Sequence, residues 1–318
     1  MRRRKIPRLC ALLIILCAAL VGCGRLVPES DSITVYATFY PIYALADAVM
    51  RDVPNARLRC LVQPQDGCLR AYQLSDWDVA RLENDADAVL LGGRGLESFE
   101  SALLSWGSSG AAVSAVLYNL PLYNADAASH GDGEQESHLD GPNPHLYLSI
   151  DGARDIVESI AASMLSLDPA FADQYLENSR NAMATLDALR AETAEIVGDV
   201  AGTPVILMNE ALIYAARDYG LNVAEWIDRE SGTMDYDDAL AARLEALLAS
   251  EARVILIERQ VPSAYVAALE SAGFAVARLD ILSTHREDEG FEGYLEAQRA
   301  NARALRAAID KNREDRKP

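Results

Sequence analysis

Short apolar runs alternate with amphipathic segments along most of this chain. The runs have the length of buried β-strands, about four to eight residues between polar or turn-forming positions. They predict strands at residues 33–38, 57–63, 88–92, 113–118, 204–208, 221–227, 253–258 and 275–279. Helical spacing of apolar positions predicts helices at residues 41–51, 75–83, 210–219, 236–250, 262–272 and 290–312. This alternation is typical of βαβ units with a mostly parallel sheet.

Two of the predicted helices begin with recognisable signals. Pro41 suits a first helical turn, where its missing N–H leaves no hydrogen bond unmade. Ser75 is expected to cap the next helix, with Asp78 three residues further on completing a capping box.

One helical pattern is much longer than the others. After a helix that starts near Asp151, it extends from Asp168-Pro169 to about Val200. Its apolar stripe consists of Leu176, Met183, Leu186, Leu189 and Ile196. About 30 residues at 1.5 Å each reach about 45 Å, more than a single small lobe requires. Such a helix fits either a bundle or a rigid connection between two lobes.

We therefore predict an α/β protein of two βα lobes with mostly parallel sheets, joined by one long spanning helix. The N-terminal lobe is expected over residues 33–165, the linking helix over 166–200 and the C-terminal lobe over 201–318. The two halves also share a short sequence similarity on the helix after their first strand, Tyr43-Ala-Leu-Ala-Asp47 and Tyr214-Ala-Ala-Arg-Asp218. This similarity is compatible with duplication and with chance. Ligands of parallel α/β sheets bind beyond the carboxyl ends of the strands, so the expected site is a cleft between the lobes.

The N-terminus has the pattern of an export signal. Basic residues followed by an apolar run occupy residues 2–20, and this run is too short to span a bilayer. It ends at Leu20-Val21-Gly22-Cys23, which matches the bacterial lipobox better than an ordinary signal with an incidental cysteine. We predict a signal peptide over residues 1–22, lipidation of Cys23 and a polar tether over residues 23–32. The mature protein would then be extracytoplasmic and lipid-anchored to the bacterial cell membrane.

The composition excludes several classes of protein. Half of the 318 residues are hydrophobic, so the chain can bury a large core and is not disordered throughout. The net charge is −19, and without the five basic residues of the signal, 24 basic and 48 acidic residues leave −24. Such an acidic body is a poor partner for nucleic acid, and no nucleic-acid binding is expected. The sequence also lacks a P-loop and the GxSxG, HExxH and CxxC motifs, so we do not expect an enzyme.

Two cysteines remain once the signal and Cys23 are set aside. Cys60 and Cys68 are separated by seven residues that include Pro64 and Gly67. Outside the cytoplasm such a pair is compatible with a disulfide, and equally with a free Cys68, because spacing alone does not determine connectivity.

Several short motifs occur in a recognisable order. They are Ala37-Thr38-Phe39-Tyr40-Pro41, Asn143-Pro144-His145-Leu146-Tyr147-Leu148, the long helix after Leu167-Asp168-Pro169, Tyr219-Gly220-Leu221, and Glu258 followed by Leu279-Asp280. With the lipobox, they make the chain resemble the solute-binding lipoproteins of zinc and manganese ABC importers over residues 33–312. The resemblance implies two lobes with a single linking helix, and an ABC permease and ATPase as partners. It also implies that a divalent metal, Zn or Mn, is bound between the lobes as solute, with no catalytic cofactor.

In that family, three histidines and one acidic residue typically hold the metal ion. The resemblance places His145 at one of the histidine positions and Asp280 at the carboxylate position. The other two histidine positions carry Arg70 and Asn209 in this chain. Two of the four usual ligands are therefore replaced.

Two neighbouring residues are the available replacements in the ligand set that the resemblance implies. Glu210 lies beside one substituted position, and Cys68 lies close to the other. With His145 and Asp280, Glu210 would give an oxygen-rich site that suits manganese, whereas the Cys68 thiolate would restore a preference for zinc. Glu210 at a helix start is equally compatible with a role in stabilising the helix dipole.

Arg70 leaves the identity of the solute open. A guanidinium about 5 Å from a dication would repel it by about 6–7 kcal/mol at an effective dielectric constant of about 20. Either Arg70 points out of the cleft, or it pairs with Glu210 or Asp280, or the cleft holds something other than a bare cation. One alternative is therefore an anionic small molecule or metal chelate bound through Arg70. Another is a surface adhesin or regulatory lipoprotein with a vestigial cleft.

Five further residues have expected roles. His285 and Glu258 are expected to line the cleft, together with the two substituted positions. His130 and His138 are expected in a solvated surface loop, and Trp77 is expected to be a packing residue.

Overall fold

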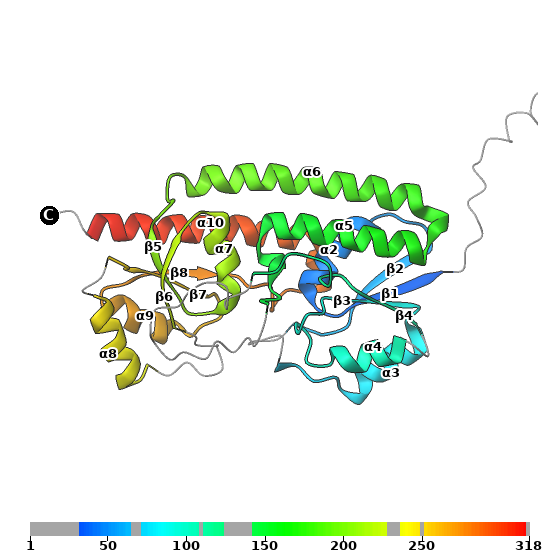
Figure 1. Cartoon of the computed structure of the whole chain (residues 1–318), viewed down its shortest axis with the longest axis horizontal. Helices are drawn as coiled ribbons and strands as arrows, with labels where there is room; N and C mark the ends of the chain where they lie inside the picture. The colour runs from blue at the N-terminus through cyan, green and yellow to red at the C-terminus, as the bar shows by residue number, and fades with distance from the viewer. Residues whose placement is uncertain are drawn as a thin grey trace, which may run out of the picture. The chain divides into compact units, whose positions relative to one another are not determined.

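The computed structural model describes residues 32–64, 71–107, 111–123, 142–227, 236–248 and 251–315, which belong to one compact unit, Ser32–Pro318. Within them, eight strands form two four-stranded sheets, and every pairing is parallel (Figure 1). The predicted α/β class with two parallel-sheet lobes is therefore confirmed.

The first lobe contains the sheet of strand order β2-β1-β3-β4. Its strands are β1 (Ile33–Ala37), β2 (Ala56–Cys60), β3 (Ala88–Leu91) and β4 (Ala112–Ala115). Its helices are α2 (Tyr40–Met50), α3 (Asp76–Asp85) and α4 (Glu100–Gly107). The capping box at Ser75 and Asp78 is present, as the sequence predicts, and the sequence analysis did not predict α4.

The second lobe repeats this topology, with strand order β6-β5-β7-β8. Its strands are β5 (Pro204–Leu207), β6 (Asn222–Trp226), β7 (Val254–Glu258) and β8 (Ala275–Leu279). Its helices are α7 (Ile213–Asp218), α8 (Asp238–Leu247) and α9 (Ser263–Ser271). In both sheets the first strand of the lobe lies between the second and third strands, which agrees with a duplicated unit.

Long helices pack along both lobes. They are α5 (Ile150–Leu167), α6 (Ala172–Val197) and α10 (Gly290–Asp315). The predicted connecting helix is α6, but α10 has the same length of 26 residues and packs beside it (Figure 1). The sequence predicts α10 as a helix but not as a second long support, because its contacts with α2 and α6 depend on tertiary packing.

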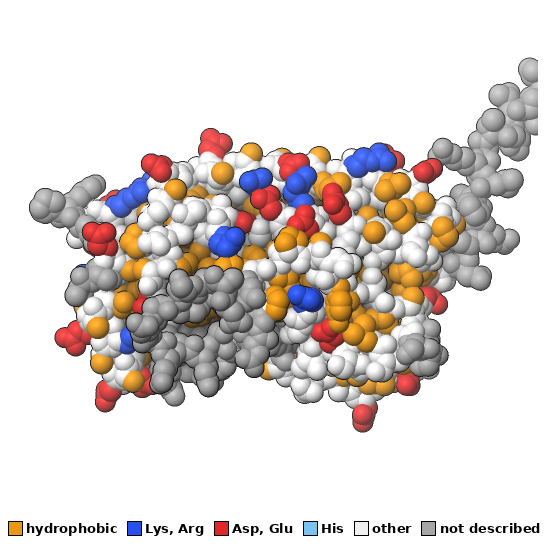
Figure 2. Space-filling model, in the orientation of Figure 1, with side chains coloured by type: hydrophobic (Ala, Val, Ile, Leu, Met, Phe, Trp, Pro, Cys, Tyr) orange, Lys and Arg blue, Asp and Glu red, His pale blue; other side chains and the backbone are white. Residues whose placement is uncertain are grey.

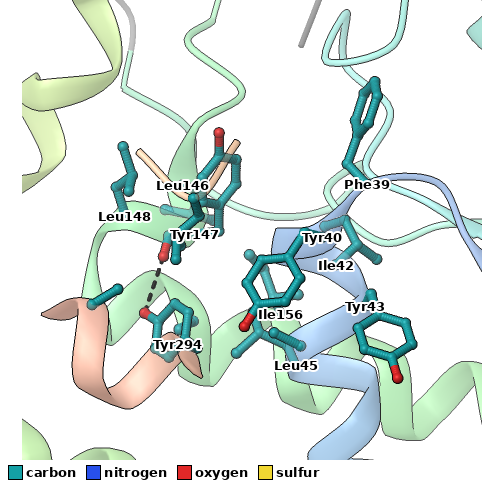
Figure 3. Close-up of a cluster of buried hydrophobic side chains, with 14 of the residues drawn as sticks. Phe39, Tyr40, Ile42, Tyr43, Leu45, Leu146, Tyr147, Leu148, Ile156 and Tyr294 are labelled. Carbon is teal, nitrogen blue, oxygen red and sulfur yellow. Dashed lines mark hydrogen bonds between the residues drawn. The ribbon is translucent and has the colours of Figure 1, made fainter. Parts of the chain in front are cut away.

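The main apolar core is continuous between the lobes. One cluster includes Val35 of β1, Leu186 of α6 and Leu207 of β5, all fully buried. Alternate residues of the same second-lobe strands, such as Ile206, point to a second cluster on the other face of that sheet. In Figure 3, side chains of α2, α5 and α10 meet beside the 3₁₀ turn η3 (Leu146–Leu148).

The surface departs from the sequence analysis at one tryptophan. Trp77 is not a packing residue: 61% of it is exposed, and the Arg81 guanidinium lies over its ring, 4.3 Å from the centroid. Charged side chains are dispersed over the face shown in Figure 2 rather than gathered into one patch. In the part of the chain that the structure describes, no helix has both the length and the apolar character of a membrane span.

Candidate functional site

Polar residues gather at the carboxyl ends of three second-lobe strands. Asn209 and Glu210 follow β5, Glu258 ends β7, and Asp280 follows β8. All four are buried, with exposed fractions between 1% and 7%. Buried polar side chains need hydrogen-bond partners, so the contacts of these residues define what the site can do.

His145 meets this edge from the segment that leads into η3. Its Nδ1 lies 2.9 Å from Asn143 Oδ1 and 4.0 Å from Glu210 Oε1. Asn143 holds the two chain segments together, because its Nδ2 donates to the Glu210 carbonyl at 2.9 Å and its own carbonyl accepts from the Tyr214 hydroxyl at 2.7 Å. The structure therefore brings His145 and Glu210, two of the predicted ligands, close to each other.

Asp280 is enclosed by donors. Its Oδ2 is 2.9 Å from Arg259 Nη1 and 2.8 Å from His285 Nε2, and its Oδ1 accepts from the Leu282 N–H at 2.8 Å. Burial by itself would raise the pKa of Asp280, but the hydrogen bond and charge of His285, with the Leu282 N–H and Arg259, hold it below its ordinary value. Arg259 and His285 thus favour the ionised form of the Asp280 carboxyl group.

His285 links Asp280 to the first lobe. Its Nδ1 is 2.8 Å from Glu289 Oε2, and its ring stacks on Tyr40 of α2 with centroids 4.8 Å apart. Burial lowers the pKa of His285, but Asp280 and Glu289 outweigh this effect and raise it above its ordinary value. The hydrogen bond to Asp280 and the two neighbouring carboxylates thus favour the protonated form of His285.

Asn209 and Glu258 form a separate polar pair. Asn209 Oδ1 accepts from the Ala211 N–H at 2.8 Å and so caps the 3₁₀ turn η5 (Glu210–Leu212). Its Nδ2 donates to Glu258 Oε1, while Glu258 Oε2 accepts from Gln260 Nε2 at 2.6 Å. The amide of Asn209 is therefore engaged in capping and in holding Glu258.

Among the described residues, the predicted ligands His145, Glu210 and Asp280 do not form one assembled metal site. Within the described ranges, no set of three or more His, Cys, Asp and Glu side chains is arranged to hold a metal ion. The physical reason at Asp280 is that Arg259 and His285 already occupy its Oδ2. Cys23, Cys68, Arg70, His130 and His138 lie outside the described residues, and their roles stay predictions.

Cys60 is a free and buried thiol in the structure. Its Sγ lies 3.3 Å from the Val62 carbonyl oxygen, and burial raises the pKa of the Cys60 thiol to about 12. Because Cys68 lies outside the described residues, the disulfide weighed for this pair also stays a prediction.

Sequence reasoning did not single out Arg259 or Asn143. Arg259 immediately follows the end of β7, and β7 pairs with β8, which precedes Asp280. Knowledge of that strand order would have placed the guanidinium beside the carboxylate. Asn143 lies in the Asn-Pro-His motif two residues before His145, and this motif is the signal from which it could have been found.

Comparison with known families classifies the chain. The family described as zinc-uptake complex component A periplasmic (ZnuA) matches residues 35–308. The chain belongs to the ZnuA family. This confirms the resemblance found in the sequence.

Two relatives show how the chain compares with other ZnuA-like proteins. It is 25% identical over 315 residues to the zinc-binding lipoprotein AdcA of Streptococcus pneumoniae, covering 94% of this chain but only 60% of that protein. It is 24% identical over 313 residues to the high-affinity zinc uptake system protein ZnuA of Bacillus subtilis, covering 94% and 95% of the two chains.

Solved structures support the ZnuA-like fold. FpvC of Pseudomonas aeruginosa in complex with Mn²⁺ has a TM-score of 0.73 at 24% identity and covers 88% of this chain and 99% of its own. Zn(II)-bound AdcA of Streptococcus pneumoniae has a TM-score of 0.73 at 21% identity and covers 88% and 58%. At these identities the similarity establishes the shared architecture.

Proposed function

We propose that this protein is the metal-binding solute receptor of an ABC importer, which delivers a divalent cation, Zn²⁺ or Mn²⁺, to a permease and its ATPase. The observation that carries this proposal is the ZnuA family match over residues 35–308. Both named relatives are zinc proteins by name, and one solved neighbour holds Mn²⁺. These relatives are solute-binding proteins, and we propose no catalysed reaction.

His145, Glu210 and Asp280 are the proposed ligands among the described residues. An imidazole and two carboxylates suit a borderline or hard divalent cation. The 4.0 Å separation of His145 Nδ1 and Glu210 Oε1 supports this pair as one side of the site. Asp280 would complete it by exchanging a present partner for the cation, and we propose Cys68 as a further ligand.

We also propose a cellular location and a domain division for the protein. The periplasmic description of the family and the lipobox support a position outside the cytoplasm with a lipid anchor at Cys23. The division into residues 33–165, 166–200 and 201–318 is supported by the two sheets, which lie on either side of α6 along the chain.

Calorimetry on the chelator-stripped mature protein tests the proposal. We expect saturable binding of Zn²⁺ or Mn²⁺ with a Kd of about a micromolar or below, in the range that corresponds to about 8 kcal/mol. His145→Ala should weaken binding about tenfold or more, since it removes a nitrogen ligand. His130→Ala serves as the matched control and should leave the affinity unchanged.

The contrary outcome is also defined. Absence of saturable binding by the wild-type protein, or an affinity that is insensitive to both His145→Ala and Asp280→Asn, would reject the metal receptor. Arg70→Ala distinguishes a cationic solute from an anionic one. The substitution should abolish binding of an anionic solute, whereas it should preserve or strengthen binding of a cation.

A further inference from the structure

The carboxylate of Asp280 already carries a cation from its own chain. Arg259 Nη1 lies 2.9 Å from Asp280 Oδ2, an ion-pair distance, and the Asp280 side chain is only 3% exposed. The same oxygen contacts His285 Nε2, and the other oxygen accepts from the Leu282 N–H. A divalent cation approaching Oδ2 would therefore meet a positive charge at short range.

The two side-chain partners of Asp280, Arg259 and His285, differ in how firmly they are held. His285 is 8% exposed, contacts Glu289 through its second ring nitrogen and stacks on Tyr40. The Arg259 side chain is 52% exposed, and its other side-chain contact within the described part of the chain is a long one of 3.4 Å to Thr284 Oγ1. Since its end reaches solvent, the guanidinium can leave Asp280 and remain hydrated.

The backbone of Arg259 fixes the point from which the side chain can swing. Its N–H donates to the Leu279 carbonyl at 2.7 Å, which ties the end of β7 to the residue before Asp280. The guanidinium is thus positioned by the sheet but anchored at its far end mainly by the ion pair. This is the arrangement of a displaceable counter-ion.

We propose that Arg259 is a built-in counter-ion of Asp280 that the incoming divalent cation displaces, so that Arg259 lowers metal affinity and stabilises the metal-free protein. This inference rests on the proposed metal-binding function. It assigns Arg259 a role in setting the affinity for the solute, although Arg259 is not itself a ligand.

Affinity measurements on an arginine variant test the proposal. Arg259→Gln should bind Zn²⁺ roughly tenfold more tightly than the wild-type protein in calorimetry, because the cation no longer competes with a guanidinium. Arg303→Gln is the matched control: it removes the same charge from a side chain that is 54% exposed and paired with Glu296 on α10. Its affinity should equal that of the wild-type protein.

A second background shows whether the effect acts through Asp280. In an Asp280→Asn protein, Arg259→Gln should change the Zn²⁺ affinity no more than Arg303→Gln does, because the two residues form one interacting pair. Equal effects of Arg259→Gln in both backgrounds would overturn the proposal.

Thermal unfolding gives a readout that does not depend on affinity alone. In the presence of chelator, Arg259→Gln should lower the Tm more than Arg303→Gln, since a buried carboxylate loses one of its cationic partners. Saturating Zn²⁺ should remove or reverse this difference in Tm between Arg259→Gln and Arg303→Gln. The reason is that Arg259→Gln binds Zn²⁺ more tightly and therefore gains more stability from it.

The outcomes separate this proposal from the proposed function. If wild-type protein binds Zn²⁺ and Arg259→Gln binds it equally or more weakly, the counter-ion role is wrong and the metal receptor stands. If neither the wild-type protein nor Arg259→Gln binds Zn²⁺ or Mn²⁺, both proposals fall. Binding that appears only in Arg259→Gln would also overturn the proposal, because the cation would then fail to displace Arg259 in the wild-type protein.

Discussion

Glu97 is a buried carboxylate in the loop that follows β3, with only 2% of the residue exposed. It accepts hydrogen bonds from Thr38 Oγ1 at 2.6 Å and from the backbone N–H groups of Gly92 and Gly93 at 2.8 Å each. These bonds tie the loop to the carboxyl end of β1. Burial raises the pKa of Glu97 above its ordinary value, and the three hydrogen bonds offset this effect only in part.

This raised pKa predicts a specific pH dependence. The folded protein holds the Glu97 proton more tightly than the unfolded chain, so the stability that Glu97 contributes falls as the pH rises above about 4.5. Glu97→Gln cannot ionise and should lose this dependence. Urea denaturation between pH 4.5 and 8 should show the free energy of unfolding of the wild-type protein falling relative to that of Glu97→Gln.

An exposed glutamate provides the control for this series. Glu83→Gln on α3 makes the same substitution at an exposed position and shows how loss of a surface carboxylate alone affects stability. A difference between wild type and Glu97→Gln that stays constant with pH would show that Glu97 has the same pKa in the folded and unfolded states.

At the scale of elements, each lobe uses an aspartate to hold the start of a long helix. Asp47 at the end of α2 accepts from the Phe291 N–H at the start of α10 at 3.0 Å. Asp218 at the end of α7 accepts from the Ile150 N–H at the start of α5 at 2.9 Å. The first N–H groups of a helix lack intrahelical partners, so a carboxylate there satisfies a donor and complements the helix dipole. The repeated Tyr-x-x-x-Asp pattern thus has one structural role in both halves.

Removing one of these aspartates should loosen the helix that it holds. Asp47→Ala should destabilise the protein by about 1 kcal/mol, the usual effect of losing a helix cap. It should also increase amide hydrogen exchange in the first turn of α10. Arg51→Ala is the matched control, because it removes only the exposed Arg51–Asp47 ion pair and keeps the cap. Equal effects of the two variants on exchange in α10 would contradict the capping role.

The sequence predicts elements better than their contacts. All eight strands of the described residues overlap a predicted strand. Central strands such as β3 and β7 are continuous apolar runs, and the edge strand β2 alternates apolar with polar residues, so both kinds stand out in the sequence. Helix α4 was missed because Leu103 is its only buried residue, which leaves almost no apolar stripe to detect.

The candidate site could be predicted only in part, because its contacts join residues that are distant in the chain. His145 and Asp280 were found through their motifs, and the structure places both at buried positions. The pairing of Arg259 with Asp280 depends on the order of β7 and β8 in the sheet, and the capping role of Asn209 depends on the turn η5. Neither follows from local sequence, because each requires residues distant in the chain or a particular backbone geometry.

At the scale of the whole molecule, the two lobes share one apolar core. Tyr294 of α10 donates to the Tyr147 carbonyl at 3.0 Å inside this core (Figure 3), and Glu287 accepts from the Cys60 N–H at 2.5 Å. Helix α10 follows the last strand of the second lobe yet packs on α2 of the first. Separating the lobes would expose apolar surface on both sides of these contacts, at a cost of about 25 cal/mol for each Å².

This shared core predicts that the lobes unfold together. Calorimetry of the chelator-stripped protein should show one transition, with a calorimetric enthalpy equal to the van't Hoff enthalpy. Leu186 of α6 is fully buried in the shared cluster, so Leu186→Ala should destabilise the protein by about 2–5 kcal/mol and shift the whole transition to lower temperature. Leu176→Ala on the same helix, at a position 38% exposed, should shift it far less. Two resolved transitions, in the wild-type protein or in Leu186→Ala, would show that the lobes are independent and that the continuous cluster does not couple them.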